Sequence, residues 1–191
     1  MGYFLWDKNN SKLKKVSLTA DGKERNQGNE SANRIVSPSI SGNGRYIAFT
    51  TTATNMTTED VNAYQDVFVY DSNTGNTVIA SNSGDGKPGN GDSPIEQGEK
   101  IAISFDGKWI AFSTNASNLG VPAVNVVMHN MSTGKNRAVS LVVGSSVGRP
   151  SISTSGGYVV FGIGGKLDSR FPSSGIFANY TGVGFCRFCP E

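Results

Sequence analysis

The sequence has little of what catalytic or membrane-spanning chains commonly need. Among its 191 residues are one histidine and two cysteines, and no apolar run approaches the roughly eighteen residues that cross a bilayer. Its 17 Lys and Arg residues nearly balance its 15 Asp and Glu residues, and no long run carries charge of one sign. These shortages argue against a membrane span, a nucleic-acid partner and attachment to an anionic membrane surface.

Glycine, in contrast, is abundant at 24 residues, and Asn, Ser and Thr crowd the segments between short apolar runs. This composition is typical of many short strands joined by turns. The length fits one domain with its own core, or a piece of a larger protein.

One phrase occurs three times, as "SISGNGRYIAF", "AISFDGKWIAF" and "SISTSGGYVVF". The aligned copies share a glycine and, two residues later, an aromatic residue: Gly44 and Tyr46, Gly107 and Trp109, Gly156 and Tyr158. Each copy predicts a hairpin with a short strand, a tight turn whose glycine takes a positive φ, and a buried apolar strand. Because the aromatic residues recur in register, we expect them in the core rather than against a ligand.

A second phrase follows the first as "DVFVYDSNTGNTVIA" (66–80), "NVVMHNMSTGKNRAV" (125–139) and, degraded, "GIFANYTGVGF" (175–185). Each predicts a strand, a turn and a strand. The N-terminal "YFLWDKNNSKLKKVSL" matches this second phrase, with Asp7 aligned to Asp71. The unit is therefore four strands. We predict an all-β chain with a half blade at 1–34, blades at 35–98 and 99–147, and a last blade, complete or incomplete, at 148–191.

Four-stranded units that repeat every fifty to sixty residues or so are the pattern of β-propeller blades. The two phrases resemble the TolB-type, WD-like propeller repeat, in which Ser-Pro-Asp-Gly-Lys-x-Ile-Ala-Phe precedes an Asp-Ile-Tyr/Phe-Val-x-Asp strand. "SFDGKWIAF" departs from the first pattern at Phe105, where the family has proline, and "DVFVYDSNTG" fits the second. The 37–114 stretch looks most like repeats of bacterial secreted propeller proteins. The resemblance implies an extracellular or cell-surface protein, with the periplasm as the alternative.

The predicted strands amount to about three or three and a half blades, whereas a closed ring normally takes about four to eight. Three explanations remain open. The chain is part of a longer protein, or two copies complete one six-bladed ring as the N-terminal strands of one fill the unfinished blade of the other, or copies add head-to-tail into a filament. The last two predict an obligate oligomer.

A long segment between two predicted strands contains "DVNAYQD", which sets Asp60, Asn62 and Asp66 at relative positions 1, 3 and 7. Alternating oxygen side chains in a tight loop can converge on a hard cation such as Ca²⁺. In the similar secreted repeats the equivalent "DxNGxxD" has the appearance of a calcium loop, with glycine where this sequence has Ala63. The alternative is a loop capped by its own Asp and Asn side chains. The equivalent loop one blade on, "NLGVPAVNVV", retains no carboxylate, so we expect one such site at most.

The remaining candidate groups carry weaker signals. Asp85 and Asp92 lie in an acidic turn that reads better as a connection between blades. Cys186 and Cys189 are too few for a structural zinc site, which leaves a small local disulfide, as the resemblance to secreted proteins suggests, a pair of free thiols, or an interchain bridge in an assembly. His129 aligns with a tyrosine of the preceding repeat, so the repeat explains its position.

We therefore expect a non-catalytic module that binds a protein partner or further copies of itself, with no cofactor apart from the candidate Ca²⁺. A single histidine and the lack of a GxSxG elbow leave no convincing catalytic triad. Two alternatives stay open: a structural subunit of an extracellular filament or surface assembly, and part of a secreted hydrolase or polysaccharide lyase propeller.

Overall fold

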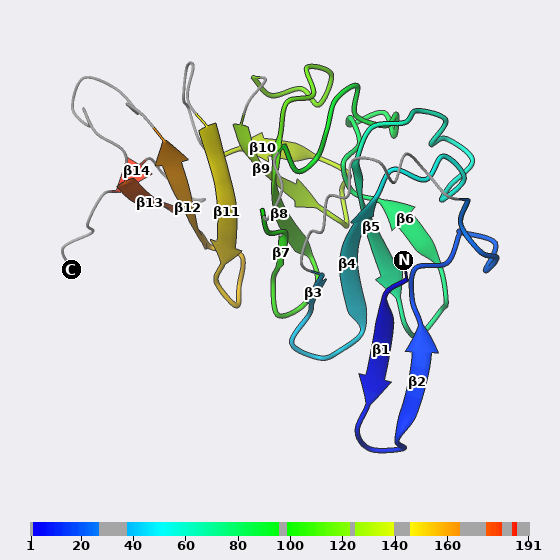
Figure 1. The fold of residues 1–191 in the computed structure, drawn as a ribbon. Helices are drawn as coiled ribbons and strands as arrows, with labels where there is room; N and C mark the ends of the chain where they lie inside the picture. The colour runs from blue at the N-terminus through cyan, green and yellow to red at the C-terminus, as the bar shows by residue number, and fades with distance from the viewer. Residues whose placement is uncertain are drawn as a thin grey trace.

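The computed structural model describes residues 2–26, 38–95, 99–122, 125–139, 146–164, 175–180 and 185–186. These residues form four antiparallel sheets and contain no helix. Figure 1 shows the sheets arrayed in chain order, from the blue N-terminal hairpin to the orange and red C-terminal strands. Every described strand pairs with a strand near it in sequence.

The strands fall into one two-stranded and three four-stranded sheets. The first sheet pairs β1 (Phe4–Asp7) with β2 (Lys12–Lys15). The second contains β3 (Ser39–Ile40), β4 (Tyr46–Thr51), β5 (Asp66–Asp71) and β6 (Thr77–Ile79). The third contains β7 (Ala102–Ile103), β8 (Trp109–Thr114), β9 (Asn125–Asn130) and β10 (Asn136–Ala138). The fourth contains β11 (Ser146–Ile152), β12 (Tyr158–Gly164), β13 (Gly175–Tyr180) and β14 (Phe185–Cys186). Each four-stranded sheet is an up-and-down meander, as predicted for a propeller blade.

The three predicted turns occur at the expected positions. Gly44, Gly107 and Gly156 have φ of 72°, 73° and 74°, a region that glycine enters without a steric penalty. In each turn the glycine N–H donates to the carbonyl three residues earlier. These glycines fix the position of the turn between the first and second strands of each four-stranded sheet. The two strands therefore pair in the same register in successive sheets.

Neighbouring sheets pack face to face, so that the second and third sheets are covered on both faces. Three apolar clusters fill these junctions. Between the first and second sheets lie Val16, Leu5, Phe49, Phe68 and Tyr70. Between the second and third lie Ala48, Val67, Val69, Ile110, Phe112 and Val127. Between the third and fourth lie Ala111, Val126, Met128, Val159, Phe161 and Ile163. The core is thus a row of inter-sheet layers, as expected for stacked blades.

An aromatic side chain of one blade covers the turn glycine of the next. A Cβ on Gly107 would lie 2.1 Å from Cδ2 of Tyr46, and one on Gly156 would lie 2.4 Å from Cδ1 of Trp109. Tyr46 and Trp109 are accordingly half-buried and pack against the clusters. The prediction of a core position is wrong for Tyr158, which is exposed because no further sheet packs beyond β12 in the described chain.

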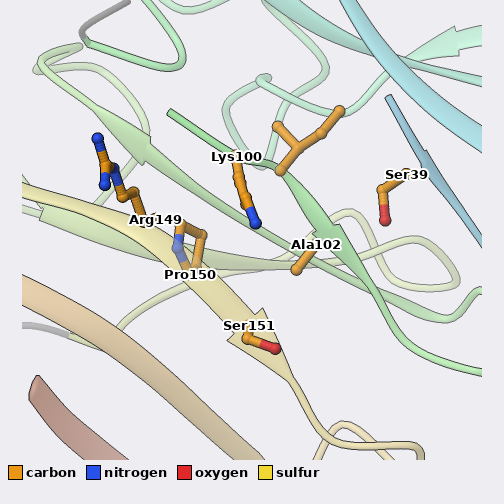
Figure 2. Close-up of a pocket in the computed structure, with 7 residues that line it drawn as sticks. Ser39, Lys100, Ala102, Arg149, Pro150 and Ser151 are labelled. Carbon is orange, nitrogen blue, oxygen red and sulfur yellow. The ribbon is translucent and has the colours of Figure 1, made fainter. Parts of the chain in front are cut away.

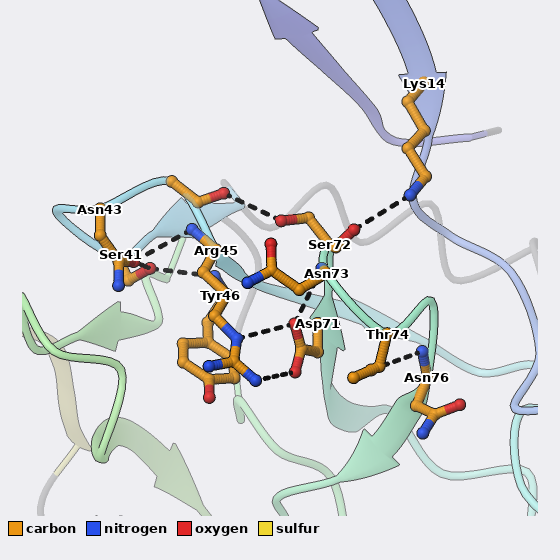
Figure 3. A network of polar contacts seen from close by, with 11 residues as sticks. Lys14, Ser41, Asn43, Arg45, Tyr46, Asp71, Ser72, Asn73, Thr74 and Asn76 are labelled. Atoms are coloured by element: carbon orange, nitrogen blue, oxygen red, sulfur yellow. Dashed lines mark hydrogen bonds and ion pairs between the residues drawn. The ribbon is translucent and has the colours of Figure 1, made fainter.

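A polar latch ties β4 to the end of β5 (Figure 3). The Arg45 guanidinium donates from Nε to Asp71 Oδ1 at 3.0 Å and from Nη2 to Asp71 Oδ2 at 2.7 Å. The same guanidinium lies 4.8 Å from the ring centroid of Tyr46. Lys14 of β2 adds a bond from its Nζ to the Ser72 carbonyl at 3.2 Å. The latch therefore joins the first two sheets at one end of their strands.

Candidate functional site

The loop that joins β4 to β5 carries the three residues predicted to bind a cation. Asp60 lies within it, and Asp66 is the first residue of β5. Asp60 is 1% exposed and Asp66 is 0% exposed, whereas Val61 and Tyr64 of the same loop are exposed. The loop therefore directs its two carboxylates inward.

One oxygen of Asp66 is satisfied and the other is not. Ser81 Oγ donates to Asp66 Oδ1 at 2.6 Å, while Asp66 Oδ2 has no hydrogen-bond partner. The pKa of Asp66 is raised to about 8, mainly by burial. The nearby charges of Asp60 and Asp92 also raise this pKa, while Ser81 and the Asn62 amide lower it. The charges of Asp60 and Asp92 therefore both act on Asp66.

Asp60 is the more unusual group because neither of its carboxylate oxygens accepts a hydrogen bond. Burial raises the pKa of Asp60 to about 6, and the backbone N–H of Asn62, near but not in bonding geometry, partly offsets this. A buried polar group without a partner costs about 1–3 kcal/mol, and a charged one costs more. No cationic side chain acts on the pKa of Asp60 or Asp66. Within the described chain these two carboxylates have no counter-charge.

Asn62 and Asp92 tie this loop to the 82–95 connection, which leads to the next blade. Asn62 Nδ2 donates to the Gly89 carbonyl at 3.3 Å, and Asn62 Oδ1 accepts the Tyr64 N–H at 2.7 Å. Asp92 Oδ1 accepts the Gln65 N–H at 2.9 Å. The oxygen of Asn62 is thus already engaged within the loop, so the carboxylates are the better candidate ligands.

Sequence reasoning grouped Asp92 with Asp85 in one acidic turn, and the structure separates them. Asp85 accepts a hydrogen bond from Ser83 and pairs with Lys87 within its own turn. Asp92 instead lies near Asp66, although 92 − 66 = 26 residues separate them in sequence. Asp66 and Asp92 come together only because the connection folds back against β5. No local sequence motif predicts this contact.

Among the described residues no three or more His, Cys, Asp or Glu side chains gather closely enough to hold a metal ion. A cation here would rest on Asp60 and Asp66, completed by neutral oxygens. Two further buried oxygens of this segment, Thr57 Oγ1 and Gln65 Oε1, have no hydrogen-bond partner. An all-oxygen donor set suits Ca²⁺ better than softer transition metals.

The next blade has a neutral residue at the equivalent place. Thr114 pairs with Asn125 in the same register in which Thr51 pairs with Asp66, and Asn125 is equally buried. The fold therefore accommodates either an aspartate or an asparagine at this point of the repeat.

A second feature is a cavity of about 510 Å³ where the inner strands of the three blades approach one another (Figure 2). Its lining residues are Ser39, Lys100, Ile101, Ala102, Arg149, Pro150 and Ser151. Arg149 takes a φ of 53° at an irregularity in the β11–β12 pairing. In Figure 2 the Lys100 amine and the Arg149 guanidinium point in different directions, so the two cations do not converge on one ligand.

His129 is a buried structural residue. It is almost fully buried in β9, and its Nδ1 lies 2.9 Å from Asn136 Oδ1. Burial lowers the pKa of His129, while the hydrogen bond with Asn136 raises it. The predicted Cys186–Cys189 pair lies outside the residues whose side chains the structure describes. None of the described residues belongs to a helix long and apolar enough to cross a bilayer.

No protein-family model matches the chain, and no curated protein matches it in sequence. Solved structures do resemble it. TolB from Acinetobacter baumannii matches with a TM-score of 0.53 and 14% identity, over 95% of this chain and 35% of that one. The tricorn protease matches with a TM-score of 0.52 and 15% identity, over 92% of this chain and 15% of that one. This chain thus spans about a third of the TolB length and less of the protease, and the likeness confirms the predicted propeller fold.

Proposed function

We propose that this chain, which has the TolB-like β-propeller fold, is a non-catalytic binding module outside the cytoplasm that assembles with further copies of itself. The resemblance to secreted propeller repeats supports an extracellular or cell-surface location, with the periplasm as the alternative. Self-assembly rests on one observation: apolar side chains of β1 are exposed at positions that are buried in the next blade.

The β1–β2 hairpin is the structural equivalent of β5–β6. In both, the first strand ends on an aspartate, Asp7 or Asp71, whose Oδ1 accepts the N–H two residues later at 2.9 Å. Val16 N–H bonds to the Tyr3 carbonyl just as Ala80 N–H bonds to the Val67 carbonyl. This alignment gives two pairs of equivalents: Phe4 with Phe68, and Trp6 with Tyr70.

The equivalent residues differ sharply in burial. Phe68 and Tyr70 are 0% and 1% exposed because the preceding sheet covers them, whereas Phe4 and Trp6 are 56% and 57% exposed. Leu13, which pairs with Trp6 across the hairpin, is also exposed. We call this surface of Phe4, Trp6 and Leu13 the leading face. In a stacked propeller it is the surface on which a preceding blade would pack.

The opposite end of the described stack has a matching exposed surface. Val160 of β12 occupies the register position of Ala48 and Ala111, since each pairs with the second-last residue of the inner strand. Ala48 and Ala111 are 0% exposed, whereas Val160 is 39% exposed. We call Tyr158 and Val160 the trailing face. It is the surface that would cover a following blade.

A second copy of this chain is the occupant that both faces fit. Each interior junction packs the trailing face of one blade on the leading face of the next, so two copies joined head-to-tail repeat a junction the fold already makes. The fourth sheet is complete with four strands, so the N-terminal strands of another copy are not needed to fill it. Face-to-face stacking is therefore the mode of assembly that the geometry supports.

Light scattering coupled to size exclusion, over a range of protein concentrations, tests the proposal. We expect the mass to rise above that of the monomer with concentration, and Trp6→Asp or Val160→Asp to hold the protein as a monomer. Val61→Asp is the matched control, because Val61 is the most exposed large apolar residue of a loop away from both faces. It should assemble as the unaltered chain does.

Mixing the two blocked variants gives the decisive measurement. Trp6→Asp retains the trailing face and Val160→Asp retains the leading face, so an equimolar mixture should form one junction and stop at a heterodimer. A mixture that stays monomeric, or assembly that Val160→Asp leaves intact, contradicts head-to-tail stacking. A wild-type chain that is monomeric at every concentration removes the self-assembly proposal altogether.

A further inference from the structure

The β4–β5 loop encloses two acidic groups that the protein leaves unsatisfied. Asp60 is nine-tenths buried or more, with both oxygens unpartnered, and Asp66 is fully buried with one unpartnered oxygen. Two further buried oxygens of the same segment, Thr57 Oγ1 and Gln65 Oε1, also have no hydrogen-bond partner. Buried charges in proteins are ordinarily paired or coordinate metals.

Four other aspartates of the described chain differ from Asp60 and Asp66 in having partners for their carboxylates. Each has a local partner that stabilises its carboxylate: Asp21 with Thr19 and Lys23, Asp71 with Arg45, Asp85 with Ser83 and Lys87, and Asp106 with Ser104 and Lys108. Their pKa values are lowered. The alternative interpretation is a loop capped by its own Asp and Asn side chains. Asp60 does not fit it, because its carboxylate caps no turn.

We propose that Asp60 and Asp66 bind a hard divalent cation of the Ca²⁺ type, beside Asp92 and at the point where the β4–β5 loop meets the 82–95 connection. The donors are carboxylate oxygens, and Ca²⁺ accepts a mixture of carboxylate, carbonyl and water oxygens in flexible geometry. Two negative charges match the charge of the ion. Because no cationic side chain acts on either carboxyl group, the ion supplies a counter-charge that the described residues do not.

The cation would fasten the interior of the β4–β5 loop to the start of β5. The loop is held to the connection by the Asn62–Gly89 and Asp92–Gln65 hydrogen bonds, and by the Ser93 N–H, which donates to the Gln65 carbonyl at 2.6 Å. A bound ion adds a link from Asp60, inside the loop, to Asp66 at the start of β5. It would therefore fix the stretch that exposes Val61 and Tyr64 at the rim of the stack. This inference is independent of self-assembly through the leading and trailing faces.

Thermal unfolding of the metal-stripped chain, with Ca²⁺, with Mg²⁺ and with chelator alone, tests the site. At a free Ca²⁺ concentration about a hundred times the dissociation constant, we expect a rise in Tm of about 5–10 °C over the chelator sample. Mg²⁺ should give a smaller rise because it demands octahedral geometry and dehydrates reluctantly. Calorimetric titration should give one bound Ca²⁺ per chain.

Two variants separate a cation site from a purely structural role. Asp66→Asn places in this blade the residue that the next blade carries at the same register, and Asp60→Asn removes the other charge. In chelator both variants should unfold at or above the wild-type Tm, because each replaces a buried carboxyl group that lacks hydrogen-bond partners with a neutral amide. Neither variant should gain stability from Ca²⁺. Asp85→Asn, in a self-contained turn, is the matched control and should keep the full Ca²⁺ shift.

The outcomes are decisive in both directions. If the wild-type Tm is the same in Ca²⁺, Mg²⁺ and chelator, and titration detects no bound ion, the site does not exist. If Asp60→Asn and Asp66→Asn retain the full Ca²⁺ shift, the ion binds elsewhere and the assignment is wrong. Loss of the shift in these two variants alone supports it.

Discussion

The ring of Phe105 lies directly against the backbone of Gly42 in the preceding blade, so that a Cβ at residue 42 would stand 1.8 Å from Phe105 Cδ2. Gly42 N–H also donates to the Phe105 carbonyl at 3.0 Å, and Phe105 N–H donates to the Thr154 carbonyl at 3.1 Å. Residues 42, 105 and 154 occupy the same turn position in three blades, so backbone hydrogen bonds run from blade to blade. This accounts for the departure from the family pattern at Phe105, since proline has no N–H to donate.

The contact of Gly42 with Phe105 predicts that the effect of Gly42→Ala on the free energy of unfolding depends on residue 105. A double-mutant cycle measures this dependence. In the wild-type chain, Gly42→Ala should lower the free energy of unfolding by about 1–3 kcal/mol, because the new methyl group must displace the ring. In a Phe105→Ala background the same substitution should be neutral or stabilising by up to about 1 kcal/mol, since alanine restricts the unfolded chain. Urea unfolding measures both. Equal effects in the two backgrounds would show that the ring and the glycine are not coupled.

The turn glycines predict a second comparison. Gly44→Ala should cost about 1–2 kcal/mol, because its positive φ is unfavourable for a residue with a Cβ and no atom of a neighbouring side chain lies near that Cβ. Gly107→Ala bears the same backbone cost and must also push Tyr46 aside, which adds about 1–3 kcal/mol. Urea unfolding of the two variants isolates the cost of moving Tyr46. Equal stability would mean that Tyr46 moves freely.

The Arg45–Asp71 latch predicts a dependence on acid. The Arg45 guanidinium holds the pKa of Asp71 at about 2, below its ordinary value of 3.8. A lowered carboxyl pKa gives stability that is present above the ordinary value and lost as the pH falls through the folded value. Asp71→Asn should therefore lower stability at pH 7 and flatten its fall between pH 4 and pH 2, relative to the wild-type chain, in circular dichroism melts.

Arg45→Lys is the control for geometry. It keeps the positive charge but loses the two-pronged contact with the carboxylate. We expect a Tm between those of wild type and Asp71→Asn. A Tm equal to that of the wild type would indicate that charge alone, and not the paired hydrogen bonds, stabilises the latch.

His129 predicts a further dependence of stability on pH, at higher pH than that of Asp71. Because burial lowers the pKa of His129 below its ordinary value of 6.5, its stabilising contribution is full above that value and is lost as the pH falls and the ring must take a proton. His129→Gln keeps a polar group near Asn136 but does not titrate. Between pH 7 and pH 5 the wild-type chain should lose stability relative to this variant. Parallel curves would place the protonation of His129 outside this range.

The repeated phrases predicted the turns and the blades because they are local. Gly44, Gly107 and Gly156 need only their own neighbours to form a turn, so one sequence suffices to recognise them. The same phrases could not predict what Tyr46 and Trp109 touch, since each contacts a glycine of the next blade. Tyr158 has the same sequence context as the other two, yet it is exposed, because burial depends on a neighbouring sheet.

The candidate cation site divides in the same way. The spacing of Asp60 and Asp66 is a local signal, and the sequence predicted both residues. Their burial, the unpartnered oxygens and the approach of Asp92 depend on how the 82–95 connection folds against β5. The pairing of Cys186 with Cys189 stays a prediction, because it concerns side chains outside the described residues.

The placement of aromatic rings over the turn glycines of the following blade has a consequence for how such a chain can change in length. The aromatic ring of one blade packs on the turn glycine of the next, as Tyr46 does on Gly107 and Trp109 does on Gly156. A duplication or deletion of one whole unit, such as the 107 − 44 = 63 residues from Gly44 to Gly107, would rejoin a ring to a glycine at the new boundary. Gene duplications or deletions of one whole unit could therefore lengthen or shorten the protein while keeping the same kind of contact between neighbouring blades.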